Sequence, residues 1–598
     1  MIDTAIQKKI LEAFSTAFNW QPESIEVVRP DPQFGDAALA CHPYARRLSQ
    51  SPQTIATALS LALSGDGVAS AQAAAGYLNI RFEASYLAQT VLTPIVEQAR
   101  NFGVVKNFPE KIAFEYSSPN TNKPLHLGHI RNNVLGMAIS NMFMSQGADV
   151  VRVQIINDRG IHIIKSMVAY KKWGEKKTPD ETGEKGDHFV GAFYVMFEKE
   201  FERQWQEWLE KNPEVPGLAD DARARRRQEF FGESEIGKES QEMLRQWESG
   251  DEDVHALWKM MNGWVYEGFK ETYRKLGSEF DKNYYESSTY LLGKKIIAEG
   301  LSEGAFYKED DGSVWIDLTP DGLDKKLVAR KDGTSVYITQ DLGLAVERQE
   351  ELGFDRMVYV VGHEQEYHFR VLFKILEKLG YDWAAKLHHL SYGLVFLPEV
   401  KMKSREGKVV DADDIIDEVQ ELASEEIKKR FPDLSDPERN ERAHMIGLGA
   451  LKFLLLQVTP TQSIRYNPAE AISFEGATGP YVQYAHARLS SVLLEETPLA
   501  AQDVDLSGLS SEAEREVLLA LADYPHMLEL ATKDQNPSSV CNYLITLSQR
   551  INTFYHSCHI LKAETDELKQ ARLLLAKASQ IVLHNGLALL GIEAPEKM

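Results

Sequence analysis

The stretch Ser-Ser-Pro-Asn-Thr-Asn-Lys-Pro-Leu-His-Leu-Gly-His ends in two histidines whose spacing suits phosphate chemistry. His126 and His129 stand where a helical periodicity begins, so both imidazoles are expected on one face of the first helical turn. Free backbone N–H groups at that helix start would add positive potential, and Gly128 would let a flat base approach the backbone. We therefore predict a nucleotide-phosphate site. Taken alone, a metal-binding pair or ordinary surface histidines would explain the same spacing.

Two strands and a helix must position this site. Apolar strand patterns at 111–116 and 151–156 flank a helical pattern at about 126–144. A strand–helix–strand unit with short connections favours parallel strands joined by a right-handed crossover. Strand patterns at 356–361 and 389–396 extend the same sheet. The sequence thus predicts an α/β, Rossmann-type domain built on a parallel sheet.

Composition limits the classes of protein to which the chain could belong. Its 598 residues carry a formal net charge of −23, which argues against sequence-blind binding along a nucleic-acid backbone but allows a local basic groove. No apolar run approaches the roughly 20 residues that a membrane span needs. Cys41, Cys541 and Cys558 lack the short paired spacings of a metal or disulfide site. We expect a cytoplasmic protein with no membrane contact and no protein-held metal.

The histidine-containing stretch resembles a family signature. His-Leu-Gly-His at 126–129 is similar to the His-Ile-Gly-His motif of class I aminoacyl-tRNA synthetases, and the longer run from 117 narrows the resemblance to arginyl-tRNA synthetases. The resemblance implies that ATP, with Mg²⁺, is a substrate whose phosphates the two histidines stabilise, and that no cofactor is tightly bound. It also implies that Ser118 and Asn120 contact the amino acid, and that arginine activation needs bound tRNA.

The sequence Lys-Met-Lys-Ser-Arg-Glu-Gly-Lys, which follows the last predicted strand, is a degenerate match to the family's mobile Lys-Met-Ser-Lys-Ser loop. The resemblance implies ATP contacts from Met402, Lys403 and Ser404. Ser404 stands where the second lysine of the motif is expected, so Lys403 or Arg405 is a candidate for the phosphate-binding charge. Lys123, three residues before the first histidine of the signature, is the other candidate. A solvated turn would explain a basic loop seen in isolation.

An arginine substrate requires a pocket for a planar cation, which carboxylates and an aromatic wall match best. Tyr337 and Asp341 are four residues apart and share a face if their segment is helical. They are similar to the family's arginine-binding pair, and Glu286 is similar to its acidic companion. Gln365 and His368 follow a predicted strand and match family positions near the nucleotide, with Gln365 also near arginine. An ordinary capping pair and a polar loop are the alternative interpretations.

The ends of the chain resemble the other family domains. Tyr481, Tyr484 and Arg488 open a helical region similar to an anticodon-binding domain, where they could stack on unpaired bases of tRNA(Arg) or form core and rim. The resemblance implies a monomer whose N-terminal domain contacts the tRNA elbow. We predict an N-terminal α+β domain at 1–108, a catalytic domain at 109–400 with a helical insertion at about 173–264, the signature loop and a helical stem at 401–460, and an all-α anticodon-binding domain at 461–598.

Three other functions remain open on the sequence. A cysteine or glutamate enzyme of the same class would lack a use for the acidic pocket and the N-terminal domain. An RNA-binding relative without catalysis would retain tRNA binding but not adenylate formation, and a small-molecule nucleotidyltransferase would keep its activity without the residues after about 460. Activity assays with each amino acid and a C-terminal truncation separate these possibilities.

Overall fold

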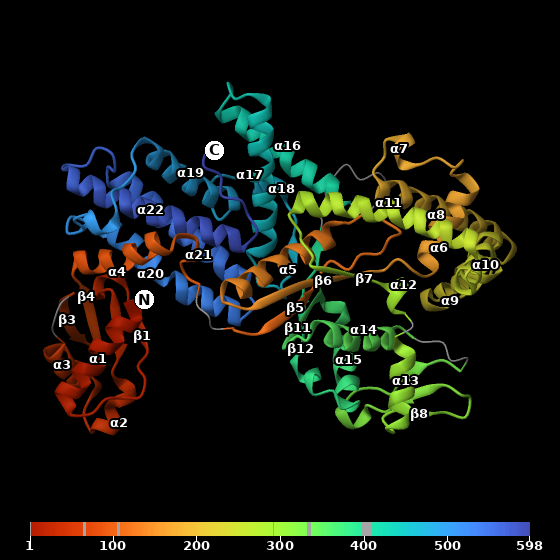
Figure 1. Cartoon of the computed structure of the whole chain (residues 1–598), viewed down its shortest axis with the longest axis horizontal. Helices are drawn as coiled ribbons and strands as arrows, with labels where there is room; N and C mark the ends of the chain where they lie inside the picture. Colours follow the sequence, from red (N-terminus) through yellow and green to blue (C-terminus); the bar gives the residue numbers. More distant parts are fainter. Residues whose placement is uncertain (1, 64–66, 105–107, 291, 332–335, 397–409) are drawn as a thin grey trace.

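The computed structural model describes residues 2–63, 67–104, 108–290, 292–331, 336–396 and 410–598. Figure 1 shows the N-terminal domain and the C-terminal helices on one side of a central sheet, and a helical insertion on the other side. The predicted fold class is confirmed in each of its parts.

The N-terminal domain is an antiparallel sheet covered by helices. Its strands, in the order β1-β2-β4-β3, are β1 (Val27–Val28), β2 (Ala37–Ala40), β4 (Tyr77–Phe82) and β3 (Val68–Ala74), and its helices are α1 (Ile2–Phe18), α2 (Ala45–Leu48), α3 (Pro52–Ala62) and α4 (Ala84–Gln98). Ala75 and Gly76 both have positive φ and form the two-residue turn of the β3–β4 hairpin, a backbone geometry that matches strand twist.

The central sheet has five parallel strands in the order β12-β11-β5-β6-β7. They are β5 (Lys111–Glu115), β6 (Asp149–Ile156), β7 (Lys282–Tyr285), β11 (Arg356–Gly362) and β12 (Leu387–Tyr392). The chain runs to opposite sides of β5, so the carboxyl ends of β5, β6 and β11 border the crevice where open parallel sheets bind ligands. The predicted β5–helix–β6 unit is confirmed, with Phe114 in register with Arg152.

Helix α5 (Leu127–Ser145), which joins β5 to β6, is buried along most of its length. Its apolar residues do not form one stripe, and a helix that is apolar on all sides packs in an interior. It lies between the sheet and the helices of the C-terminal domain (Figure 1). The catalytic sheet and the C-terminal helices are therefore joined through the helix that begins beside His126.

The strand predicted at 389–396 is interrupted. β12 ends at Tyr392, and β13 (Val395–Phe396) instead pairs in parallel with β14 (Ile464–Arg465). A Cβ on Gly393 would lie 2.7 Å from backbone atoms of residues 461–463, so this close approach requires glycine. The prediction of one continuous strand was wrong because the chain leaves the sheet here to pair with a distant segment.

Helices and a small sheet complete the catalytic half of the molecule. The described helices are α6 (Ile161–Trp173), α7 (Pro179–Thr182), α8 (Gly186–Lys211), α9 (Asp220–Glu233), α10 (Glu235–Ser249), α11 (Glu252–Leu276), α12 (Glu286–Thr289), α13 (Gly293–Ser302), α14 (Tyr337–Leu352) and α15 (Glu366–Lys378); the small antiparallel sheet has β8 (Tyr307–Lys308), β9 (Val314–Ile316) and β10 (Lys326–Ala329). The insertion buries an aromatic core that includes Phe197, Phe201 and Trp205.

The C-terminal region is helical apart from β14. Its helices are α16 (Ala412–Arg430), α17 (Asp436–Leu456), α18 (Pro468–Ala471), α19 (Gly479–Glu495), α20 (Glu512–Lys533), α21 (Pro537–Ser557) and α22 (Asp566–Leu589). A buried ion pair joins it to the N-terminal domain: Arg515 Nε lies 2.6 Å from Asp36 Oδ1, and Arg515 also donates to Phe82 O at 2.7 Å. None of the described helices combines the length and the apolar character of a membrane span.

Candidate active site at the carboxyl edge of the sheet

The two signature histidines cap the helix that they introduce. His126 is the N-cap of α5, and its Nδ1 accepts the Gly128 N–H at 3.2 Å. His129 Nδ1 accepts the His126 N–H at 3.1 Å, and the two ring centroids are 3.9 Å apart. The expectation that these N–H groups are free was therefore wrong, because the imidazoles themselves satisfy them.

This arrangement fixes where the imidazole protons lie. Since each Nδ1 accepts a backbone hydrogen bond, a neutral ring must carry its proton on Nε2. Within the described part of the chain, neither Nε2 of His126 nor of His129 has a hydrogen-bond partner. The site thus presents two neighbouring N–H donors, which suits an oxyanion.

Burial and positive charge keep these histidines neutral. Burial lowers the pKa of His126 to about 4, with a further contribution from Lys123. The pKa of His129 is lowered by burial, then by His126 and Lys123, and burial also lowers the pKa of Lys123. Three basic side chains thus share one partly buried volume, and an arriving phosphate would supply the missing negative charge.

The loop before α5 has an unusual backbone. Ser117 (φ 72°) and Ser118 (φ 49°) are consecutive non-glycine residues in the left-handed region, which is costly unless the surroundings enforce it. Tyr273 provides such support, with its hydroxyl 2.7 Å from Ser117 Oγ, and Asn132 Oδ1 accepts the Ser117 N–H. Asn120, predicted to contact the amino acid, is exposed at the edge of the sheet.

The predicted guanidinium-binding residues converge near the same edge. Tyr337 begins α14, so it and Asp341 share a helix face as expected, and Tyr337 is 79% exposed. His368 Nε2 lies 2.6 Å from Asp341 Oδ2. Burial raises the pKa of Glu286 to about 7; Arg159 opposes the rise, and the negative charges of Asp158 and Asp341 increase it.

Asp158 is a site residue that the sequence interpretation missed. It is 1% exposed, and its carboxylate accepts hydrogen bonds from Ser287 N–H at 2.8 Å, Ser287 Oγ at 2.7 Å and the Tyr266 hydroxyl at 2.7 Å. These bonds fix the start of α12, which carries Glu286. An acidic residue two positions after a parallel strand and shortly before Gly160 was a detectable signal, because ligands bind at that edge.

Arg131 was also missed. It is fully buried on α5, and its guanidinium donates to four carbonyl oxygens at 2.6–3.1 Å. The acceptors belong to Gly393, Leu394, Pro460 and Gln462. Burial lowers its pKa to about 10. Arg131 thus holds the helix of the signature histidines to the point where the chain leaves β12.

Of the other predicted site residues, one lies at the start of α15 and four lie outside the described residues. Gln365 is exposed beside His368 at the start of α15. Met402, Lys403, Ser404 and Arg405 lie outside the described residues.

The residues predicted to contact tRNA lie elsewhere, on α19. Arg488 donates to Asn552 Oδ1 at 2.7 Å, and the Tyr481 hydroxyl accepts from Asn552 Nδ2 at 2.9 Å. The Arg488 guanidinium also lies 4.7 Å from the ring centre of Tyr484 and 4.8 Å from that of Tyr555. These side chains form a half-exposed aromatic and polar cluster, here called the α19 cluster.

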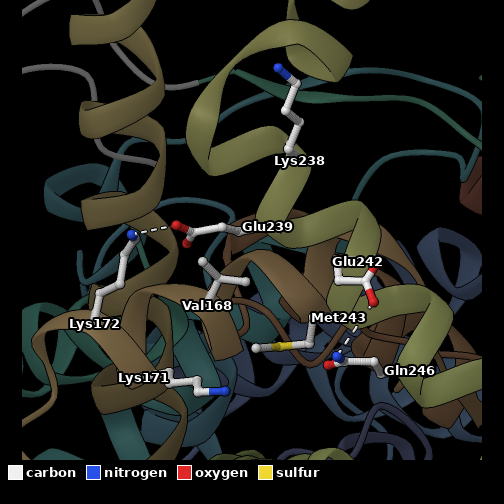
Figure 2. Close-up of a pocket in the computed structure, with 8 residues that line it drawn as sticks. All are labelled: Val168, Lys171, Lys172, Lys238, Glu239, Glu242, Met243 and Gln246. Atoms are coloured by element: carbon white, nitrogen blue, oxygen red, sulfur yellow. Dashed lines mark hydrogen bonds and ion pairs between the residues drawn. The ribbon is translucent and has the colours of Figure 1, made fainter.

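A cavity of about 550 Å³ lies between α6 and α10 in the insertion (Figure 2). Lys172 pairs with Glu239 at 2.7 Å, and Gln246 contacts Glu242 at 3.5 Å. None of the predicted site residues that the structure describes lines the cavity. The neighbouring helix α9 carries the basic run 223–227, and Arg226 of this run pairs with Glu229 and Glu233, as expected of a solvated helix face rather than an RNA contact.

Known proteins match the chain along nearly its whole length. Family models match residues 2–82 (arginyl tRNA synthetase N terminal domain), 91–466 (tRNA synthetases class I (R), catalytic domain) and 482–598 (DALR anticodon binding domain). The chain is 44% identical to the arginine–tRNA ligase of Parabacteroides distasonis over 94% of each chain, and 43% identical to that of Treponema denticola over 96% of this chain and 95% of the relative. It resembles the solved arginyl-tRNA synthetase of Thermus thermophilus at 26% identity, with a TM-score of 0.77 over the full length of both chains.

Proposed function

The chain belongs to the arginyl-tRNA synthetase family and is an arginine–tRNA ligase of class I, and we propose how its residues divide the work. In the first step a carboxylate oxygen of arginine attacks the α-phosphorus of ATP, and the bond to pyrophosphate breaks. In the second, a hydroxyl of the terminal adenosine of tRNA(Arg) attacks the carbonyl carbon of arginyl-adenylate and AMP leaves. Neither step needs a protein nucleophile, so positioning and charge stabilisation must supply the catalysis.

In this proposal His126 and His129 donate their Nε2–H groups to phosphate oxygens as negative charge moves onto pyrophosphate. Their shared capping geometry is the single observation that carries the assignment, because it orients two neutral N–H donors in advance. Lys123 adds a nearby positive charge. Lys403 or Arg405 would supply a second one, and Mg²⁺ would accompany ATP.

For the amino acid, we assign the guanidinium to Glu286 and Asp341, with Tyr337 as an aromatic wall. The partly buried Glu286 carboxyl, whose pKa lies near 7, lacks a full counter-charge, which a bound arginine would provide. Asn120, Ser118 and Gln365 would orient the α-amino and carboxylate groups. Two acidic groups in one pocket disfavour a cysteine or glutamate substrate.

Recognition of tRNA(Arg) is assigned to two further regions. The α19 cluster would stack on unpaired anticodon bases, since its tyrosine rings are half-exposed and Arg488 is already ordered by Asn552. The N-terminal domain would contact the tRNA elbow. We further propose that the enzyme is a monomer and acts in the cytoplasm. Its three cysteines, all among the described residues, are buried and form no disulfide, which suits a reducing compartment.

Arginine-dependent ATP–pyrophosphate exchange, run with and without tRNA and with each other amino acid, tests this function. Exchange with arginine and tRNA together, and little without tRNA, is the expected result. Exchange with another amino acid would refute the pocket assignment. Binding of tRNA without any exchange would point to a non-catalytic RNA-binding protein.

A further inference from the structure

A second group of buried charges lies at the start of α16, which receives side chains from the start of α8 and from the end of α11 (Figure 1). It contains no residue assigned above. We propose that this group positions His126 by fixing the chain segment against which His126 is paired. Here it is called the Asp413 cluster, and it consists of Asp413 and the side chains that contact its carboxylate, Lys185, His188, Thr272 and Lys275; Asp187 lies beside it and, among these side chains, contacts only that of Lys185.

Asp413 is the centre of the cluster. Its side chain is 10% exposed, and its oxygens lie 2.6 Å from Lys185 Nζ, 3.1 Å from Lys275 Nζ and 3.2 Å from His188 Nε2. Burial opposes ionisation, but hydrogen bonds from His188 and Lys185 outweigh it and hold the pKa of Asp413 below its ordinary value. Asp413 is thus a buried carboxylate with contacts from both α8 and α11.

The same groups do not form a metal site. Ligand atoms of Asp187, His188 and Asp413 lie within 4.8 Å of one another, as they would around an ion. However, Lys185 Nζ contacts Asp413 at 2.6 Å and Asp187 at 3.2 Å, and it also donates to Thr272 at 2.5 Å. An ammonium group therefore already occupies the place between the two carboxylates, and it neutralises them.

The residues just before Asp413 are paired with the signature segment. Asp411 and His126 form an isolated antiparallel bridge, and the Ala412 N–H donates to Leu125 O at 2.8 Å. Within the described part of the chain, the other hydrogen bonds of His126 all run to the first turn of α5. On the opposite side from α5, the His126 backbone is paired with Asp411 through this bridge. Asp411 is two residues before Asp413 in the chain.

Lys185 and His188 of the insertion, together with Lys275 at the end of α11, fix Asp413, and Asp413 fixes the Asp411–Ala412 backbone beside Leu125–His126. Weakening the cluster would let that bridge open and would change the direction of the His126 Nε2–H. Misplacement by about 1 Å at a catalytic group can cost on the order of 10²-fold in rate. Asp413 is therefore a positioning residue, and its role in catalysis rests on the function proposed for His126.

The test compares Asp413→Asn with Asp187→Asn in the full-length enzyme. Both changes remove a buried carboxylate from Lys185, but Asp187 does not touch the Asp411–Ala412 segment. Asp413→Asn is expected to lower kcat for pyrophosphate exchange roughly 10- to 100-fold with little change in KM for arginine. Hydrogen exchange of the Ala412 amide should become faster in the same variant. Asp187→Asn should change neither by more than about twofold.

Equal effects of the two variants on kcat and on the Ala412 amide would overturn the proposal, as would an unchanged amide in Asp413→Asn. If Asp413→Asn does not fold, Lys275→Met is the second variant, because it removes a more exposed contact of Asp413. If hydrogen exchange of the Ala412 amide is not faster in Lys275→Met, the proposal is also contradicted. His126→Asn separates the two hypotheses. Full activity in that variant would refute the role of His126, while the amide measurement would still decide whether Asp413 holds the bridge.

Discussion

At the carboxyl edge of the sheet the assigned residues come from the loop before α5, from α5 itself, and from α12, α14 and α15, whereas the α19 cluster comes from one helix face and the neighbouring α21. The edge contains groups with displaced pKa values and two serines with left-handed backbone. In the α19 cluster the polar groups bond to one another through Asn552. The first region therefore holds oriented N–H donors and an acidic group without a full counter-charge in advance of its substrates, and the second offers an ordered surface on which we propose that bases stack.

Because the two regions differ in this way, we expect substitutions in them to impair different steps of the reaction. Changes at the sheet edge should alter the rate of activation or the binding of arginine, because they remove donors and charges that the reaction needs. Changes in the α19 cluster should alter only the use of tRNA. Variants in each region test this separation between arginine activation and the use of tRNA, and the largest effect is expected for His126→Asn.

His126→Asn is expected to reduce kcat for arginine activation by about 10²–10³-fold, as removal of one oriented donor to a developing charge does elsewhere. Asparagine is among the best N-cap residues, so α5 should still be capped and the melting temperature should change little. Steady-state pyrophosphate exchange and a thermal melt provide the two measurements. A kcat within threefold of the native value would show that His126 serves only as a cap.

Asp341→Asn is expected to raise KM for arginine by about 30- to 100-fold, since a bound guanidinium would bury this carboxylate, and loss of one partner of a buried charge pair costs on the order of 2 kcal/mol or more. The asparagine can still accept from His368, so local structure should persist. Asp324→Asn is the matched control, because Asp324 accepts the Tyr367 hydroxyl at 2.5 Å but lies outside the proposed pocket. Equal KM values for the two variants would remove Asp341 from the arginine site.

The sequence predicts the α19 cluster more fully than it predicts the carboxyl edge of the sheet. A helical repeat alone places Tyr484 and Arg488 on one face, so the α19 cluster needs no tertiary knowledge beyond its partner Asn552. At the sheet edge the apolar strands and the start of α5 were also predictable from periodicity. Arg131 was not, because nothing in a periodic pattern distinguishes a buried, hydrogen-bonded charge from a solvated one. Asp158 was marked only by its place just beyond a parallel strand.

Arg488→Met tests the helical region. It should raise KM for tRNA about 10- to 30-fold, within the range for loss of one stacked base, and leave KM for arginine unchanged at saturating tRNA. Arg550→Met on α21 is a suitable control, since Arg550 pairs with Glu516 rather than with the tyrosines. If KM for arginine rose instead, the two regions would not be functionally separate.

The smallest expected effect is the pH dependence of arginine binding. Burial raises the pKa of Glu286 to about 7, so this carboxyl is mostly neutral at pH 6 and mostly ionised at pH 8. Only the ionised form attracts a guanidinium, and KM for arginine should therefore fall about five- to tenfold as the pH rises between these values. Glu286→Gln should abolish that dependence.

Protein stability provides an independent check on the same group. Because its pKa is higher in the folded protein than in the unfolded chain, Glu286 contributes stability that is complete below about pH 4.5 and is lost as the pH rises through 7. Glu286→Gln should consequently raise the melting temperature at pH 8 relative to the native protein, but not at pH 5. A variant that weakens arginine binding while stabilising the fold would identify Glu286 as a charge kept for its substrate rather than for the structure.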